Sequence, residues 1–183
     1  MFRQVILFLS FLTLVGCMST GGRKEELQSW PLAPLLSEGP RQLNQHLRIV
    51  YQGDEYELMA ATFHTFESLK ISLLSPEGIS LLDVTYDGNE VSTHYHMSRA
   101  ERVPPEKLLA DIQFVYWPIA QLREVLPVGW NLDEAIVEGI YTRKLSRNGE
   151  VNSVARYSSK DIWKAQIELE HKLLGYRLSI RNF

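Results

Sequence analysis

The chain has 183 residues, a formal net charge of −3 at pH 7 and 45% hydrophobic residues. This length and composition are typical of one globular domain with a hydrophobic core. Neither half of the chain has a strong excess of basic residues, so nucleic acid is not expected as a partner. Cys17 is the single cysteine, which excludes an intramolecular disulfide and calls for another role in an exported chain.

The N-terminus has the pattern of an exported and lipidated protein. After Arg3, the apolar run VILFLSFLTLV (Val5 to Val15) has the length of a secretory signal core, and it is too short for a permanent spanning helix of about 20 residues. The following residues, LVGC, resemble the bacterial lipobox. We therefore predict a lipoprotein signal peptide over residues 1–16 and acylation of Cys17, which anchors the chain to a membrane through its lipid. In lipoproteins of this type, an aspartate directly after the cysteine indicates retention at the inner membrane. Met18 follows Cys17 here, which implies the outer membrane if the source is a diderm bacterium, with the domain facing the periplasm.

Residues 17–40 are predicted to hold the lipidated cysteine, a small polar tether and a proline-rich strap. The strap begins at Trp30 and has three prolines, which exclude a long helix and favour an extended chain over the domain. Its apolar side chains are expected to pack on the core; they are Trp30, Leu32, Leu35 and Leu36. Residues 41–183 are then one folded domain.

Hydrophobic periodicity divides this domain into two strand groups and a helical segment. From His46 to Met97 the period is two, and turn signals such as Asp87-Gly88 join up to five strands into an antiparallel meander. Between Pro104 and Leu122, apolar residues recur every three or four positions and predict an amphipathic helix, which Pro118 kinks or splits. Strands return over residues 135–146, 151–158, 161–172 and 175–183, with Asn148-Gly149 as a hairpin turn.

One helical segment is too small to cover some eight or nine strands. We therefore predict a mainly β (α+β) fold, in which an antiparallel curved sheet forms an incomplete β-barrel around the helical segment. Such a sheet has a concave apolar interior.

The lipobox, the hairpin Gly78 to Val91 and the helix Pro104 to Pro118 are similar in kind and order to the LolA/LolB superfamily of lipoprotein carriers and receptors. More narrowly, they resemble an uncharacterised family of outer-membrane lipoproteins that accompany aryl-polyene clusters. The resemblance implies a half-barrel that binds or transfers a lipid or hydrophobic amphiphile, such as an acyl chain, in aryl-polyene or glycolipid export. It implies no enzyme activity and no cofactor. The expected ligand-binding residues are Leu58, Leu73, Leu82, Val84, Ile112, Tyr116 and Trp163.

One departure from the outer-membrane receptor concerns a loop. The receptor presents a protruding apolar residue there, whereas the comparable turn in this chain, Ser75 to Gly78, reads SPEG.

The alternative function is a non-catalytic structural or assembly lipoprotein that binds another envelope protein.

A cupin-like metal enzyme is the third hypothesis. Gly88, His94, His96 and Glu101 have the spacing of the first cupin motif, and imidazoles with a carboxylate can bind a divalent metal. The glycine that should follow this motif is replaced by Leu108, and the second cupin motif is missing.

Asp83 lies in an apolar run. An Asp83 carboxylate with a hydrogen-bonded partner is a simpler interpretation than a buried acid with a perturbed pKa. No nucleophile elbow, P-loop or dinucleotide fingerprint is present, and Arg143-Lys144 is interpreted as solvated surface.

Overall fold

The structure is a computed structural model that describes residues 30–183. In this range the chain forms one antiparallel sheet of ten strands, with a helical segment inserted between the fifth and the sixth strand. The strands are β1 (Arg41–Tyr51), β2 (Asp54–His64), β3 (Leu69–Leu74), β4 (Ser80–Tyr86), β5 (Val91–Tyr95), β6 (Trp130–Val137), β7 (Ile140–Arg147), β8 (Glu150–Tyr157), β9 (Ile167–His171) and β10 (Tyr176–Asn182). The helical segment consists of η1 (Ser98–Arg102), α2 (Pro105–Tyr116) and α3 (Ile119–Val125).

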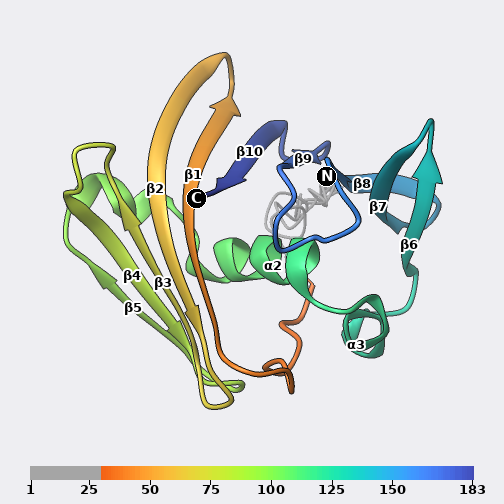
Figure 1. The fold of residues 1–183 in the computed structure, drawn as a ribbon, viewed down its shortest axis with the longest axis horizontal. Helices are drawn as coiled ribbons and strands as arrows, with labels where there is room; N and C mark the ends of the chain where they lie inside the picture. Colours follow the sequence, from red (N-terminus) through yellow and green to blue (C-terminus); the bar gives the residue numbers. More distant parts are fainter. Residues whose placement is uncertain (1–29) are drawn as a thin grey trace, which may run out of the picture.

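The first and the last strand of the chain are neighbours at the centre of the sheet. β1 pairs with β2 on one side and with β10 on the other, which places Gln45 opposite Asn182. The strand order is β5-β4-β3-β2-β1-β10-β9-β8-β7-β6, so β5 and β6 are edges that do not pair with each other. Figure 1 shows the sheet curving from β1–β5 round to β6–β9, with α2 on the concave side. The predicted mainly β fold with a curved antiparallel sheet around a helical segment is therefore confirmed.

Two predicted strands of the C-terminal half differ from the observed ones. Residues 135–146 form a hairpin, because β6 ends at Val137 and β7 begins at Ile140. Glu138 and Gly139 make the turn with φ of 52° and 82°, the pair of positive angles that a type I′ turn requires. Apolar residues on both sides of this turn hide it in the sequence. The second difference lies in residues 161–172, where β9 begins only at Ile167 and Trp163 lies in the preceding turn.

The helical segment is split as predicted at Pro118, between α2 and α3.

The interpretation of Arg143 as solvated surface is wrong, because its side chain is 2% exposed. Its guanidinium donates to the carbonyl oxygens of Phe114 (2.5 Å) and Trp117 (2.9 Å) and to Glu134 Oε1 (2.5 and 2.8 Å). A cation therefore satisfies carbonyls at the C-terminal end of α2, where the helix dipole favours positive charge.

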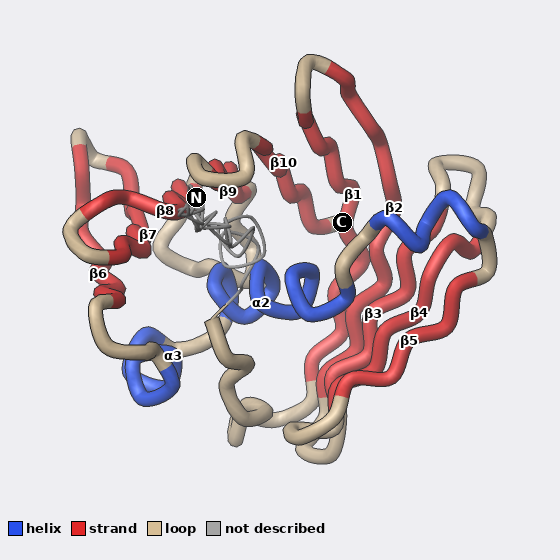
Figure 2. The backbone as a smooth tube through the Cα atoms, turned by 180° about the vertical axis from the view of Figure 1, so that it is seen from behind, coloured by secondary structure: helices blue, strands red, loops and turns tan. Residues whose placement is uncertain are grey.

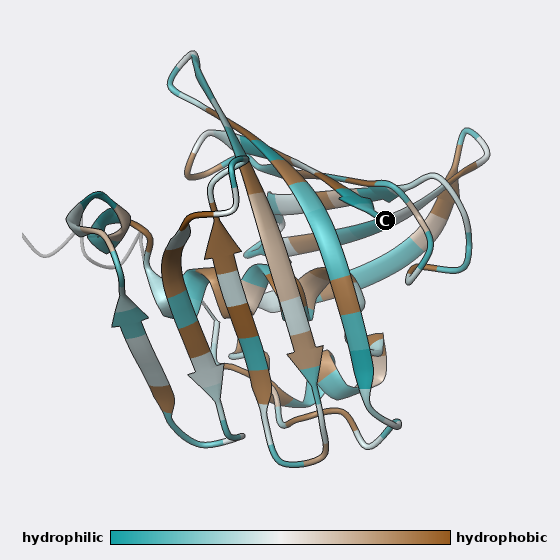
Figure 3. Ribbon diagram, turned by 60° about the vertical axis from the view of Figure 1, so that its left-hand side comes forward, coloured by the Kyte–Doolittle hydropathy of each residue, from teal (hydrophilic) through white to brown (hydrophobic). Residues whose placement is uncertain are grey.

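The strap is held across the concave side by hydrogen bonds to α2. The Gln113 side chain accepts from the Ala33 amide (2.7 Å) and donates to the Ala33 carbonyl (2.8 Å), while Trp117 Nε1 donates to the Pro34 carbonyl (2.9 Å). Trp30 and Leu36 are buried in the core, as expected. Figure 2 shows the strap and α2 on the same side of the sheet, and Figure 3 shows apolar and polar residues alternating along the strands.

The predictions for the signal peptide, Cys17 and the tether concern residues 1–29, which lie outside the described residues. Within residues 30–183, a helix with the length and apolar character needed to cross a membrane is not found.

Candidate ligand-binding cleft

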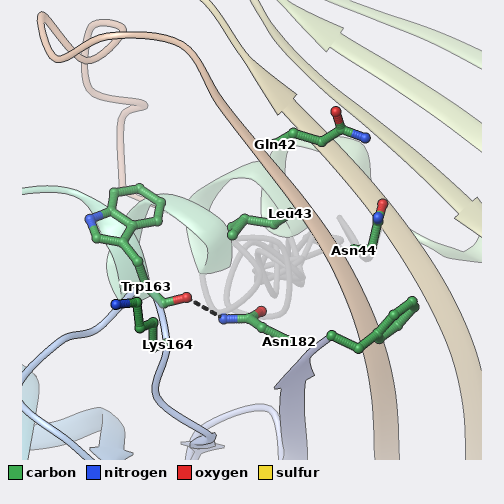
Figure 4. Close-up of a pocket in the computed structure, with 7 residues that line it drawn as sticks. Gln42, Leu43, Asn44, Trp163, Lys164 and Asn182 are labelled. Atoms are coloured by element: carbon green, nitrogen blue, oxygen red, sulfur yellow. Dashed lines mark hydrogen bonds between the residues drawn. The ribbon is translucent and has the colours of Figure 1, made fainter.

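A cleft of about 590 Å³ lies where the start of β1, the turn before β9 and the end of β10 meet. Its volume falls within the range of roughly 300–1,000 Å³ that is usual for small-molecule sites. Figure 4 shows Leu43, Trp163 and Asn182 around the cleft, with a hydrogen bond from the Asn182 side chain to the Trp163 carbonyl. The lining residues are Gln42, Leu43, Asn44, Trp163, Lys164, Asn182 and Phe183. The lining therefore combines apolar, amide and basic groups.

Trp163 is the largest side chain of the cleft, and two other side chains hold it. Its ring stacks on that of Tyr116, with centroids 4.9 Å apart and planes inclined by 14°. The Arg41 guanidinium carbon lies over the Trp163 ring at 4.3 Å from its centroid. Trp163 therefore contacts both an aromatic ring from α2 and a cation from β1.

A buried amide network supports the same corner. Gln45, which is 1% exposed, donates through Nε2 to Tyr116 Oη (2.7 Å) and to Asn182 Oδ1 (2.8 Å). Asn182 Nδ2 in turn donates to the Trp163 carbonyl (2.7 Å). Burial raises the pKa of Tyr116 to about 12, so its hydroxyl remains protonated at neutral pH. The turn that holds Trp163 is thereby tied to β1, α2 and β10.

The residues predicted to bind the ligand are divided between the core and the cleft. Most of them are in the hydrophobic core, at most 8% exposed; they are Leu73, Leu82, Val84, Ile112 and Tyr116. Leu58 is half-buried and packs against this core. Trp163 alone of the seven lines the cleft, from a turn rather than from the predicted strand. A role of these side chains in ligand binding stays a prediction.

The other cleft residues were not predicted from the sequence. Gln42, Leu43 and Asn44 belong to the first part of β1, which begins five positions before the predicted start at His46, since residues 41–45 follow a proline and are mostly polar. The spacing of Leu43, Leu47 and Ile49 on one face of a strand was the signal that could have extended it, although the polar Gln45 interrupts that face.

A second cluster of ionisable side chains lies between α2 and β9–β10. Asp111 accepts hydrogen bonds from Lys107 Nζ and Tyr176 Oη, and the Tyr176 ring stacks on His171 at 5.2 Å. Burial lowers the pKa of His171 to about 3, with the charge of Lys107 acting in the same direction, and burial also raises the pKa of Tyr176. His171 Nδ1 accepts from the Leu174 amide (3.2 Å). Since these groups hydrogen-bond within the fold, the cluster acts as a cross-link between helix and sheet.

The histidines of the cupin-like motif lie on the outer, exposed face of the sheet. His96 Nε2 is 2.6 Å from Asp83 Oδ2, and the His94 and His96 rings are 4.6 Å apart. Asp83 has the partner expected of the simpler interpretation, and its pKa is lowered first by a hydrogen bond from Ser72 and then by His96. Over residues 30–183, no group of three or more His, Cys, Asp or Glu side chains is arranged to hold a metal ion.

The model of a family described as "Protein of unknown function (DUF3261)" matches residues 42–183, which cover the sheet, the helical segment and all cleft residues. No curated protein matches the chain.

Proposed function

The chain belongs to the DUF3261 family of proteins of unknown function, and on that premise we propose that its domain binds a lipid or another hydrophobic amphiphile. It does so without catalysis or a cofactor, in the manner of the LolA/LolB carriers and receptors that its order of elements resembles. The amphiphile is bound or transferred in the periplasm, and export of an aryl polyene or a glycolipid is the process that the resemblance suggests.

The cleft is the single observation that supports this proposal most. Leu43 and the Trp163 ring offer an apolar surface for a tail, while Asn44, Asn182 and Lys164 offer polar groups for a head. A site of mixed character is what an amphiphile needs, since its tail gains from leaving water and its head must keep hydrogen bonds.

Energetics are compatible with transfer. Burial of a tail of about sixteen carbons gains roughly 12 kcal/mol relative to water, at ~0.8 kcal/mol per CH₂. Moving the same tail from a bilayer gains almost nothing, because both environments are apolar. A carrier can therefore load and unload without nucleotide hydrolysis, and small differences in affinity set the direction.

The membrane anchor belongs to the same proposal. Acylated Cys17 holds the chain at the outer membrane, and residues 18–29 give the domain reach into the periplasm. The chain's charge gives it no reason to lie on anionic headgroups, so the lipid itself is the attachment.

Exposed apolar residues favour the second candidate function, binding to another envelope protein. The β6–β7 hairpin tip exposes Ile136 (60%), Val137 (51%) and Ile140 (45%), next to the unpaired edge of β6. The β3–β4 turn also has an apolar residue, because Ile79, directly after the SPEG residues, is 55% exposed. Sheet edges and apolar tips are surfaces that partners cover.

Native mass spectrometry of the full chain, purified from a bacterial envelope in neutral detergent, tests the proposal. We expect a co-purified hydrophobic ligand, or displacement of a fluorescent fatty-acid probe by added lipid. A Leu43→Asp/Trp163→Ala variant should lose the ligand, whereas Tyr56→Ala on the exposed β1–β2 hairpin should retain it. A chain without ligand that also ignores the probe refutes lipid binding, and the hairpin-tip surface then becomes the leading functional site.

A further inference from the structure

Three buried polar atoms on the inner face of β1 and β2 have no hydrogen-bond partner. They are Arg41 Nε, Thr62 Oγ1 and His64 Nδ1, which we call the donor cluster. Arg41 lies directly opposite His64, and Thr62 precedes His64 by two positions on β2. Opposite residues have Cβ atoms about 5 Å apart, and alternate residues share a face. That face is the inner one, since Thr62 is 4% exposed and His64 is 3% exposed.

All three atoms can donate a hydrogen bond. The Leu36 amide donates to His64 Nε2 (3.2 Å), so the proton of the neutral ring is on Nδ1. Burial lowers the pKa of His64, and the charge of Arg41 acts in the same direction, which keeps the ring neutral at pH 7. Arg41 Nε always bears a proton, and the Thr62 hydroxyl can turn its proton toward an acceptor.

Buried donors without acceptors are costly, and three that lie close together on neighbouring strands call for a physical explanation. An oxyanion can accept from all three donors, whereas a cation would meet only positive and partly positive groups. Glu38, on the strap, already binds Arg41 Nη2 at 2.9 Å, which shows that this guanidinium is placed to engage a carboxylate.

The donor cluster adjoins the cleft through two residues. Leu43 lines the cleft and is the cross-strand partner of Thr62. Trp163 lines the cleft and covers the Arg41 guanidinium. Leu43 and Trp163 therefore join the cleft lining to Thr62 and to Arg41, whose side chain is 38% exposed.

We propose that the donor cluster binds the anionic headgroup of the amphiphile, a carboxylate or a phosphate, while its tail lies along Leu43 and Trp163. This inference rests on the proposed function, because it names the head of the ligand bound in that cleft. The headgroup oxygens accept from Arg41 Nε, Thr62 Oγ1 and His64 Nδ1. Trp163 moves off Arg41 to admit the headgroup, and the Glu38 carboxylate competes with the headgroup for the Arg41 guanidinium.

Calorimetric titration of the full chain in neutral maltoside detergent tests the headgroup. The probes are octyl phosphate and octanoate, the uncharged octanol, the cationic octylamine, and inorganic phosphate and acetate without a tail. We expect the two anionic amphiphiles to bind at least about tenfold more tightly than octanol or octylamine, as hydrogen bonds to a charged group allow. The tailless anions should bind more weakly than their octyl counterparts.

Variants separate headgroup binding from folding. Thr62→Val and Arg41→Met should weaken the binding of octyl phosphate about tenfold and leave octanol unchanged. Glu38→Gln should tighten it, because it removes a competing carboxylate. Thr62→Val should also leave stability to urea equal or higher, since it deletes an unpaired buried hydroxyl, whereas Thr62→Ser keeps the hydroxyl and should retain binding. Thr85→Val, a substitution on the outer side of β4, is the matched control and should change neither quantity.

Each contrary outcome overturns a defined statement. Equal affinity for octanol and octanoate, or unchanged affinity in Thr62→Val and Arg41→Met, overturns the headgroup assignment and leaves the proposed function standing. Equal affinity for inorganic phosphate and octyl phosphate makes the cluster a site for a free oxyanion, which contradicts both the lipid headgroup and tail binding in this cleft. Absence of binding by every amphiphile refutes the proposed function and the headgroup with it.

Discussion

Arg143 offers the sharpest test of how the helical segment is held in the sheet. Its guanidinium joins three elements, since it comes from β7, binds Glu134 on β6 and caps the carbonyls of Phe114 and Trp117 around the end of α2. Arg143→Met keeps the length of the side chain and most of its apolar contacts but removes all of these hydrogen bonds.

The expected loss follows from what the substitution leaves behind. The Glu134 carboxylate is 23% exposed, and two main-chain carbonyls lose a charged donor. Removal of one partner of a buried ion pair costs about 3–5 kcal/mol, and the partial exposure of Glu134 places the expected loss near ~3 kcal/mol. For a domain of this size the melting temperature should fall by roughly 6–12 °C.

Urea unfolding followed by circular dichroism measures this loss. The control is Arg147→Met, a change of the same type at the exposed end of the same strand, where the guanidinium lies over Trp130 at 5.6 Å; it should cost less than about 1 kcal/mol. Glu134→Gln in the Arg143→Met background should recover part of the loss, because it removes the unpaired charge. A loss below about 1 kcal/mol in Arg143→Met would refute the conclusion that this side chain fastens α2 to the sheet.

Three further predictions concern stability and the strap. Burial lowers the pKa of His171 to about 3 from an ordinary value near 6.5, so the unfolded chain binds the proton more readily. The free energy of unfolding should therefore fall as the pH drops from about 6.5 to 3. In His171→Gln this fall, measured by urea unfolding at several pH values, should be shallower by up to ~1.4 kcal/mol per pH unit. Gly139 has φ of 82° in the β6–β7 turn, so Gly139→Ala should lower the unfolding free energy by about 1 kcal/mol. Glu138→Asn, at φ of 52°, should raise the unfolding free energy by a few tenths of a kcal/mol. Changes of the opposite sign would contradict a type I′ turn. Gln113→Leu removes both hydrogen bonds to Ala33. Limited proteolysis should then cleave residues 30–40 faster, while the far-ultraviolet circular dichroism spectrum of the domain stays the same. An unchanged cleavage rate would mean that these hydrogen bonds do not hold the strap.

Local sequence signals were sufficient for most elements of the fold. Alternating apolar residues and Asp-Gly or Asn-Gly turns predicted the β1–β5 meander and the β7–β8 hairpin, and Pro118 predicted the division between α2 and α3. These signals are reliable because side-chain alternation, turn angles and the missing proline amide act over a few residues. The Glu138-Gly139 turn was missed, since glutamate is not a typical turn residue and both flanking segments are apolar.

The cleft and the donor cluster, by contrast, exist only in the tertiary structure. Pairing of β1 with both β2 and β10 brings Arg41 and Thr62, from the first hairpin, together with Asn182 from the last strand, and the turn before β9 adds Trp163. Periodicity shows which side of a strand faces inward, but it cannot show whether an inward side chain is packed or unpartnered, because that depends on every strand and helix that faces it. The sequence alone thus determined a curved sheet with an apolar inner face, and the packing of α2, the strap and the C-terminal strand decided where a cleft remains beside that face.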